Sequence, residues 1–289
     1  MNMYLALLPS LGLLAVIALF GRSAELARLR GWLVEAVKGL PQVVVCSGEA
    51  GIGKTRLLEA LSDEAESGGA QVLWARSLAP ASAPPYWLWR QLFGTDVVTG
   101  PVPVTGSVPV GTVPEGDRAA LFERLAGRLI EAAAAGGAVM VVDDIHWADE
   151  PSLVALMHMV RTLHRAKLLV CVAERSGGPD SSDGWRGARS SLIREPHAHL
   201  LELHGLSRAG SAELLRELLG RSMPEPVVSQ AHAICAGNPF YLREVARALD
   251  RVVGSDVELP ATLAGGRRAA PRTADAAHAG AAARLIDPG

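Results

Sequence analysis

Lysine is nearly absent from this chain of 289 residues, which has 28 lysines and arginines together but only three lysines, at positions 38, 54 and 167. Cysteine is also scarce. The three cysteines lie far apart, which excludes a disulfide framework, gives no zinc-ligand spacing and favours a reducing compartment. Neither sign of charge dominates, and the net charge of -2 excludes a chain that is basic overall, as many nucleic-acid-binding proteins are. Apolar residues are abundant at 49%, which excludes wholesale disorder and predicts a sizeable core.

The first 20 residues contain an uncharged apolar run from Met3 to Phe20. Its length is within the range of a transmembrane helix, although Pro9 and Gly12 weaken a continuous helix. A signal peptide is disfavoured, because no basic residue precedes the run and no clear cleavage site follows it. Two interpretations stay open. Residues 3–20 either contact a membrane as an anchor, or form an unusual or incorrectly assigned start whose last residues pack on the domain that follows.

Short apolar segments alternate with segments of helical periodicity between residues 21 and 205. Such alternation predicts βαβ units and a parallel sheet, so the expected fold is a three-layer α/β sandwich. The expected strands are 42–46, 71–75, 138–142, 167–173 and an edge strand at 199–203. The expected helices are 23–38, the segment from the glycine-rich loop to 66, 86–93, 117–135 and 149–165.

Three regions depart from that alternation. Residues 94–116 are rich in Gly, Pro, Val and Thr and predict a loop insertion, and a second loop is expected at 176–187. From residue 206 to 258 the pattern is helical, with expected helices at 209–219, 225–236 and 239–249, which predicts a small helical lid subdomain. Residues 259–289 have few large apolar residues and predict a disordered tail.

The segment from Gly48 to Thr55 reads GEAGIGKT and matches the phosphate-loop pattern G-x-x-x-x-G-K-[ST] in full. It follows a predicted strand and opens a predicted helix, so its backbone N–H groups and the helix N-terminus would face the phosphates of ATP. Lys54 would reach the β- and γ-phosphates, and the Thr55 hydroxyl would ligate Mg²⁺. The predicted nucleotide-binding residues of this segment are Gly48, Glu49, Ala50, Gly51, Ile52, Gly53, Lys54, Thr55 and Arg56.

A second motif ends the predicted strand at 138–142, where four apolar residues precede Asp143 and Asp144. Ligands of open α/β sheets bind at the carboxyl ends of the strands, so both carboxylates are candidates for the same site. Asp143 would hold Mg²⁺ through water, and Asp144 would polarise the attacking water. The alternative for Asp144 is a loop or helix-cap carboxylate. His146 is predicted to position the Asp144 loop rather than to bind the metal, because nucleotide-bound Mg²⁺ prefers oxygen.

Five motifs occur in a fixed order: GRSAEL at 21–26, GEAGIGKT at 48–55, VVDDIHWAD at 141–149, LLVCVAER at 168–175 and GNPF at 237–240. This order resembles the AAA+-like signal-transduction ATPases with numerous domains (STAND), in particular the Orc-like AAA ATPase module of large ATP-binding LuxR-type transcriptional regulators. The resemblance extends over residues 20–263.

The resemblance implies three further roles. Gly21 and Arg22 match a motif that lies against the adenine, although Ser23 stands where the family usually has an acidic residue. Arg175 matches an arginine that senses the γ-phosphate, where a cation would oppose the charge that develops in phosphoryl transfer; the alternative is a surface arginine. Pro239 matches a lid motif that closes over the base, and its alternative is a simple boundary between two helices.

These observations lead to an ATP-binding, slowly hydrolysing switch in the cytoplasm, with ATP/ADP as ligands, Mg²⁺ as cofactor, and self-association or a regulatory protein as further partners. The family usually continues into output domains, whereas residues after Leu263 change abruptly and contain no DNA-reading element. A truncated or frame-shifted product and a short protein with a disordered tail both fit this change. The alternative functions are a membrane-anchored P-loop ATPase, a P-loop phosphotransferase and an inactive remnant.

Overall fold

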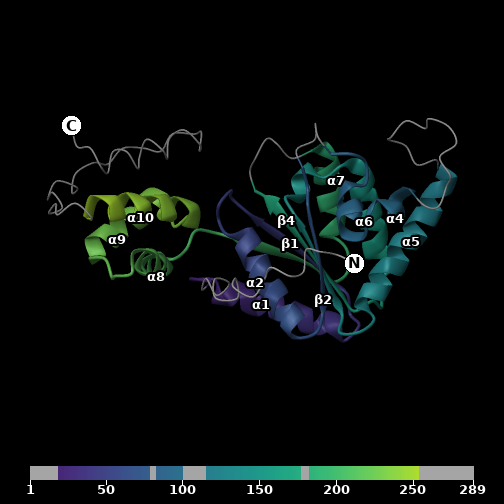
Figure 1. The fold of residues 1–289 in the computed structure, drawn as a ribbon, viewed down its shortest axis with the longest axis horizontal. Coiled ribbons are helices and arrows are strands. Elements are labelled where there is room, and N and C mark those ends of the chain that lie inside the picture. The colour runs from purple at the N-terminus through teal and green to yellow at the C-terminus, as the bar shows by residue number, and fades with distance from the viewer. Residues whose placement is uncertain (1–18, 79–82, 100–114, 177–181, 254–289) are drawn as a thin grey trace, which may run out of the picture.

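The computed structural model describes residues 19–78, 83–99, 115–176 and 182–253. These residues form an α/β domain and a smaller group of helices beside it (Figure 1). Most of the apolar N-terminal run, most of the predicted insertion and the whole predicted tail lie outside the described residues. Within the part that is described, no helix combines the length and the apolar character needed to cross a bilayer.

The α/β domain is built on a five-stranded parallel sheet with the order β2-β3-β4-β1-β5. This confirms the predicted fold class and the edge position of the last strand. Parallel strands place all their carboxyl ends at one edge of the sheet, which is where ligands bind in such folds. The strands are β1 (Gln42–Gly48), β2 (Gln71–Arg76), β3 (Ala138–Asp143), β4 (Leu168–Arg175) and β5 (Ala198–Leu203).

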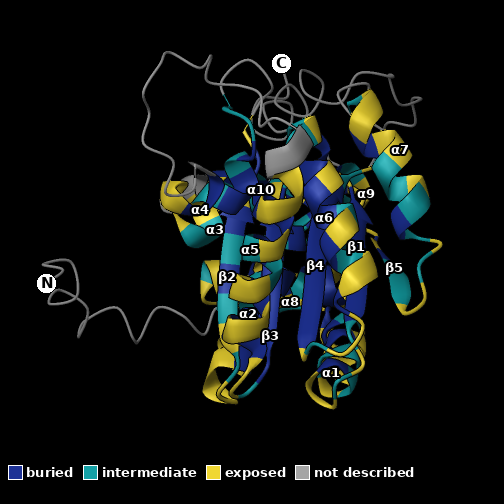
Figure 2. Cartoon of the chain, turned by 90° about the vertical axis from the view of Figure 1, so that its right-hand side faces the viewer, coloured by how far each residue is buried: buried dark blue, intermediate teal, exposed yellow. Residues whose placement is uncertain are grey.

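Helices cover both faces of the sheet, so the central strands are buried along their length (Figure 2). Val139 and Val141 of β3 face one layer, and Met140 and Val142 face the other, because side chains alternate along a strand. The first layer contains α1 (Ser23–Val37) and α2 (Lys54–Ser67). The second contains α3 (Trp87–Phe93), α4 (Thr95–Thr99), α5 (Glu115–Ala133), α6 (Glu150–Thr162) and α7 (Asp183–Leu192).

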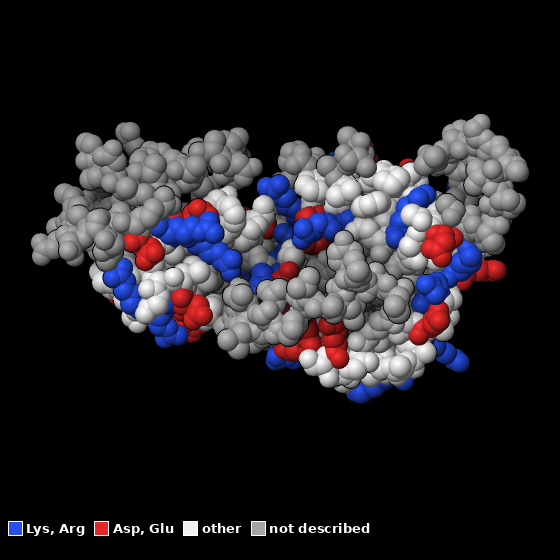
Figure 3. Space-filling view, viewed as in Figure 1, with Lys and Arg blue, Asp and Glu red and all other residues white. Residues whose placement is uncertain are grey.

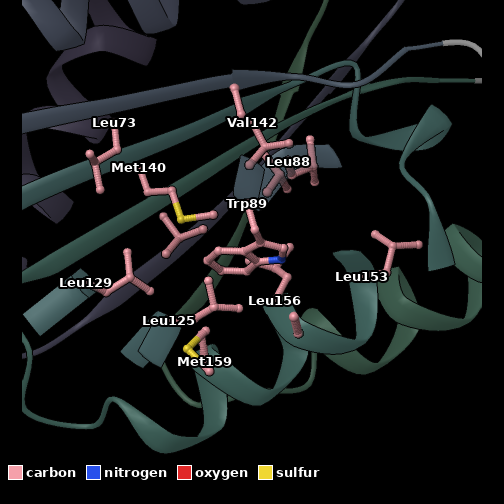
Figure 4. Packing of buried hydrophobic residues seen from close by; sticks show 14 of the residues in the cluster. Leu73, Leu88, Trp89, Leu125, Leu129, Met140, Val142, Leu153, Leu156 and Met159 are labelled. Carbon is pink, nitrogen blue, oxygen red and sulfur yellow. The ribbon is translucent and has the colours of Figure 1, made fainter. Parts of the chain in front are cut away.

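The second layer packs around Trp89, whose side chain is fully buried. Figure 4 shows the indole of Trp89 between Met140 of the sheet and the leucine and methionine side chains of the surrounding helices. Its ring nitrogen donates to the backbone oxygen of Ser152 at 3.2 Å, which satisfies the one polar atom of the side chain. The predicted helix at 86–93 is therefore a core element.

Two predicted loops are wrong in part. The second half of the 176–187 loop is helical, because α7 begins at Asp183 and Ser182 caps it by accepting from the backbone N–H of Trp185. Trp185 is buried, and this packing offsets the low helix propensity of the two glycines in α7. The 94–116 segment contains α4 and the first two residues of α5, with residues 100–114 outside the described part.

The helical subdomain consists of α8 (Arg208–Leu219), α9 (Glu225–Cys235) and α10 (Pro239–Val253). These helices pack around their own apolar cluster, to which Phe20 from the start of the described chain also contributes. The subdomain is joined to β5 by a close backbone crossing, in which the N–H of Leu206 donates to the oxygen of Gly237 at 2.8 Å. A Cβ atom on Gly237 would collide with the backbone of Leu206, so the crossing requires glycine.

Candidate functional site

The phosphate loop lies between the end of β1 at Gly48 and the start of α2 at Lys54. Gly51 and Gly53 have φ angles of 73° and 104°, which L side chains rarely adopt. A Cβ atom on Gly51 would also lie 2.5 Å from the Cβ atom of Phe240 in the helical subdomain. Ile52 is buried and anchors the loop on the α/β domain. The backbone path thus requires both glycines, and the close approach of the subdomain is a second requirement at Gly51.

The side chain of Lys54 folds back onto its own loop. Its Nζ atom donates to the backbone oxygens of Gly48 at 2.8 Å and Glu49 at 2.9 Å. Burial lowers the pKa of this ammonium group from its ordinary value, and the charges of Asp143 and Asp144 act in the opposite direction. The loop therefore has an internal cation at its centre, held by two acceptors that an anion could replace.

Asp143 ends β3 with a side chain that is 2% exposed. Its Oδ2 atom accepts from the Thr55 hydroxyl at 3.0 Å and from the guanidinium of Arg76 at 2.6 Å. Arg76 ends the neighbouring strand β2 and is paired with Asp143 in the sheet register. Thr55 and Asp143 were both predicted from the sequence as magnesium ligands. Arg76 was not, because its only signal was a basic residue at the end of the second strand.

Asp144 follows with a left-handed backbone, at φ 55°. Its N–H donates to Oδ1 of Asp143 at 3.1 Å, which holds the second oxygen of that carboxylate. Burial raises the pKa of Asp144 above its ordinary value, and the charge of Asp143 adds to this effect. A left-handed non-glycine residue beside a buried carboxylate is the kind of local strain found at functional sites.

The short 3-10 helix η1 (Ile145–Trp147) comes next, and it carries His146. The imidazole is buried, and its Nδ1 atom has no hydrogen-bond partner among the described residues. Burial lowers the pKa of His146, which favours the neutral ring. The backbone oxygen of His146 accepts from the N–H of Ser182 at 3.3 Å. The prediction that His146 positions the Asp144 loop stays a prediction.

Lys54, Thr55, Asp144 and His146 line one cavity of about 420 Å³, a volume typical of small-molecule sites. Arg175, at the end of β4, lies on its wall together with Lys54 and Asp144. The opposite wall belongs to the helical subdomain, and basic side chains lie along the hollow between the two units in Figure 3. The residues around the cavity are Ala50, Gly51, Gly53, Lys54, Thr55, Arg56, Asp144, His146, Trp147, Arg175, Pro239, Phe240 and Arg243.

A smaller hollow of about 60 Å³ adjoins the first, and the residues that precede α1 lie on its wall. Arg22 lies on its wall but is itself buried, with its guanidinium donating to the backbone oxygens of Ile52 and His204. The Arg22 guanidinium also donates to the Glu25 carboxylate at 2.8 Å, three residues further along the chain. Gly21 has a φ of 61° and packs against the subdomain at Leu206. Arg22 therefore lines the hollow and connects the phosphate loop to the residue that follows β5, and Gly21 precedes it in the turn against the subdomain.

Pro239, which begins α10, and Arg243 on the same helix border both hollows. The preceding residue, Asn238, is 3% exposed and was not predicted from the sequence, although the GNPF motif contains it. Its Nδ2 atom donates to the backbone oxygen of Ala50 at 3.0 Å, while its Oδ1 atom accepts from the N–H of Phe240 at 3.0 Å. One side chain thus caps α10 and connects the helical subdomain to the phosphate loop.

The family model of the AAA ATPase domain matches residues 18–172, which is more than half of the chain and includes the phosphate loop and both aspartates. The chain belongs to the AAA ATPase domain family. No curated protein is significantly similar to it.

Solved structures show that this AAA ATPase domain shares its fold with proteins of low sequence identity. The Walker-type ATPase PABY2304 of Pyrococcus abyssi aligns with a TM-score of 0.52 and 13% identity, covering 80% of this chain and 68% of that one. Cdc6p from Pyrobaculum aerophilum aligns with a TM-score of 0.54 and 14% identity, covering 81% of this chain and 62% of that one. At these identities the likeness shows the fold alone.

The donor set of this AAA ATPase domain fits a magnesium ion. The Thr55 hydroxyl and the Asp143 carboxylate are both hard oxygen ligands, and they lie 3.0 Å apart at the edge of the cavity. Two protein ligands suit Mg²⁺ bound with a nucleotide, because phosphates and waters complete its coordination.

We expect replacement of Asn238 to loosen the phosphate loop of the AAA ATPase domain. Asn238→Ser keeps a cap for α10 but is too short to donate to Ala50, so it should cost about 1 kcal/mol and speed amide hydrogen exchange at residues 49–53. The matched control is Ser207→Ala, which removes the cap of α8, where Oγ of Ser207 accepts from Gly210, without touching the loop. Equal exchange at residues 49–53 in both variants would contradict the connection.

Proposed function

We propose that this AAA ATPase domain binds ATP with Mg²⁺, hydrolyses it slowly, and acts as a nucleotide-dependent switch. The observation that supports this proposal best is the convergence of Lys54, Asp144 and Arg175 on one cavity, beside Thr55 and Asp143, with the helical subdomain as its other wall. These residues come from the ends of β3 and β4 and from the start of α2, so chance proximity in the sequence does not explain their meeting.

Binding of ATP would exchange the hydrogen-bond acceptors of the Lys54 ammonium group. Lys54 now donates to two backbone oxygens of its own loop, and the β- and γ-phosphates would take their place at the ammonium group. The N-terminus of α2 and the loop N–H groups would add further donors. Thr55 and Asp143 would hold Mg²⁺. Once bound, that ion would neutralise charge on the β- and γ-phosphates.

Hydrolysis would depend on Asp144 and Arg175. The Asp144 carboxylate would accept a proton from water as its oxygen attacks the γ-phosphorus, while the bond to the β-phosphate oxygen breaks and ADP leaves. The Arg175 guanidinium would stabilise the charge on the transferred group. The raised pKa of Asp144 suits a proton acceptor, since a more basic carboxylate takes a proton more readily.

The switch would be the relative position of the two units. Pro239, Phe240 and Arg243 face the same cavity as the phosphate loop, so loss of the γ-phosphate changes what the helical subdomain can contact. A ligand shifts such an equilibrium only through different affinities for the two arrangements. ATP and ADP differ in the γ-phosphate, which is the group that would lie between Arg175 and Arg243.

The wider role follows from the motif order. We propose a STAND-type regulatory module, as in LuxR-type transcriptional regulators, working with a second copy or a regulatory protein and without direct DNA contact. We also propose a cytoplasmic location, which the three unpaired, buried cysteine thiols support. The support for the module is the order of GRSAEL, GEAGIGKT, VVDDIHWAD, LLVCVAER and GNPF along the chain.

The test is calorimetry of the full chain with Mg·ATP, followed by phosphate release with no acceptor present. We expect a dissociation constant of about micromolar magnitude, equivalent to about 8 kcal/mol, and slow release of phosphate. Binding with turnover only after an acceptor is added would favour the phosphotransferase. A folded chain that binds no nucleotide would contradict the switch.

A further inference from the structure

The Asp143 carboxylate is already engaged by a cation of the chain itself. Oδ2 of Asp143 accepts from the Arg76 guanidinium at 2.6 Å and from the Thr55 hydroxyl at 3.0 Å. This is the oxygen that faces Thr55, the side on which a magnesium ion would bind. A guanidinium and a divalent cation cannot both lie against one carboxylate oxygen without repelling each other.

The two partners differ in their freedom to move. The Asp143 side chain is 2% exposed and belongs to a buried strand, whereas the Arg76 side chain is 55% exposed. Arg76 could turn into solvent and regain hydration at small cost in free energy, because more than half of its own side chain is already exposed. Asp143 has no such alternative, because an unpaired buried carboxylate is costly. The cation is therefore the partner that would move.

The backbone of Arg76 is held while its side chain is free to move. Its N–H donates to Oε1 of Gln91 at 3.2 Å, and its oxygen accepts from Nε2 of Gln91 at 2.8 Å and from Nε1 of Trp87 at 3.2 Å. β2 is an edge strand, and the Gln91 amide pairs with it much as another strand would. Helix α3 thus fixes the point from which the guanidinium reaches Asp143.

We propose that Arg76 is an internal counter-cation of Asp143, a positioning residue that occupies the metal's side of the carboxylate and must leave it when Mg²⁺ binds with ATP. This rests on the proposed function. In the absence of metal, Arg76 cancels the negative charge of Asp143 next to the phosphates of the nucleotide. In its presence, Arg76 competes with the ion for the same oxygen.

Two opposite effects on nucleotide binding follow for Arg76→Gln, which keeps a hydrogen-bond donor and removes the charge. The Mg²⁺ concentration that half-saturates binding should fall about tenfold, equivalent to about 1.4 kcal/mol, because the competitor is lost. Affinity measured in EDTA should fall severalfold, because the uncompensated Asp143 charge repels the phosphates. Arg76→Lys retains a cation and should lie between this variant and the wild type in both measurements.

The experiment uses the full chain and a fluorescent N-methylanthraniloyl ATP, first in EDTA and then with increasing Mg²⁺. Arg161→Gln is the matched control, because Arg161 also has a 55% exposed side chain and pairs with a carboxylate, Glu195, at 2.7 Å. That pair lies away from the cavity. The half-saturating Mg²⁺ concentration and the affinity in EDTA should therefore both equal those of the wild type. Each readout is an equilibrium of binding and needs no turnover.

A half-saturating Mg²⁺ concentration that stays unchanged or rises in Arg76→Gln would overturn the proposal. A wild-type chain that binds no fluorescent ATP would instead contradict the proposed function, so the two failures are distinguishable. If Arg76→Gln does not fold, a crystal structure of the wild type with Mg²⁺ and a non-hydrolysable ATP analogue decides the question. An Arg76 guanidinium still bonded to Asp143 in that complex would overturn the proposal as well.

Discussion

Lys54→Ala should weaken Mg·ATP binding by about 2 kcal/mol or more, roughly thirtyfold, because a charge-assisted bond to phosphate is lost. The ammonium group lies at the centre of the phosphate loop, 2.8 Å and 2.9 Å from two backbone oxygens, so it is already directed at the place where the phosphates would bind. No other lysine lies near the cavity among the described residues. The measurement is calorimetric titration of wild type and variant with Mg·ATP.

Lys38, one of the other two lysines of the chain, provides the control for that titration. Lys38→Ala also removes a lysine and an ion pair, with Glu35 at 2.8 Å, but both of those side chains are exposed. We expect wild-type affinity from Lys38→Ala. Far-UV circular dichroism should show both variants folded, since Lys54 bonds only to its own loop. Retention of wild-type affinity by a folded Lys54→Ala chain would exclude the phosphate loop as the binding site.

Asp144→Asn should reduce ATP hydrolysis by about a hundredfold or more and leave Mg·ATP affinity within about twofold of the wild type, because general-base assistance is lost while the phosphate and metal ligands remain. Asp63→Asn, an exposed aspartate on α2, is the matched control and should hydrolyse ATP at the wild-type rate. The measurement is phosphate release under saturating ATP. An equal loss of affinity and rate would instead place Asp144 among the binding groups.

The same carboxylate gives the reaction a pH dependence with a defined sign. Burial, aided by the charge of Asp143, raises the pKa of Asp144 above its ordinary value. Since the deprotonated form accepts the proton from water, the rate should rise as pH increases through this raised pKa and fall below it. Asp144→Asn should lose this rise of the hydrolysis rate with pH. A group whose pKa is raised on folding makes the folded state less stable above that pKa, so Asp144→Asn should not lower stability at neutral pH.

Local chemistry made part of the site predictable. A phosphate loop is a continuous segment whose glycine, lysine and threonine each have a fixed task, so GEAGIGKT indicates its own geometry. Asp143 and Asp144 were predictable because they follow a buried strand, and the carboxyl ends of parallel strands share one edge of the sheet. Arg76 and Asn238 carried no comparable signal. Each acts on a partner far away in the sequence, Asp143 and Ala50 respectively, and such pairing depends on sheet register and on subdomain packing.

Helix α7 shows the same limit within the fold. Two glycines and polar neighbours favour a loop, yet Trp185 fills a place in the core and Ser182 caps the helix, so tertiary packing outweighs local propensity.

The sequence by itself determined the parallel α/β fold, the phosphate loop and the two aspartates, because strand periodicity and glycine-rich turns are encoded by neighbouring residues. Only the tertiary structure decided which groups surround them. It paired Arg76 with Asp143, joined Asn238 to the phosphate loop, and buried Arg22 between Ile52 and His204. These contacts join residues between 30 and 188 positions apart, and their energies come from burial and charge pairing that exist only once the chain has folded.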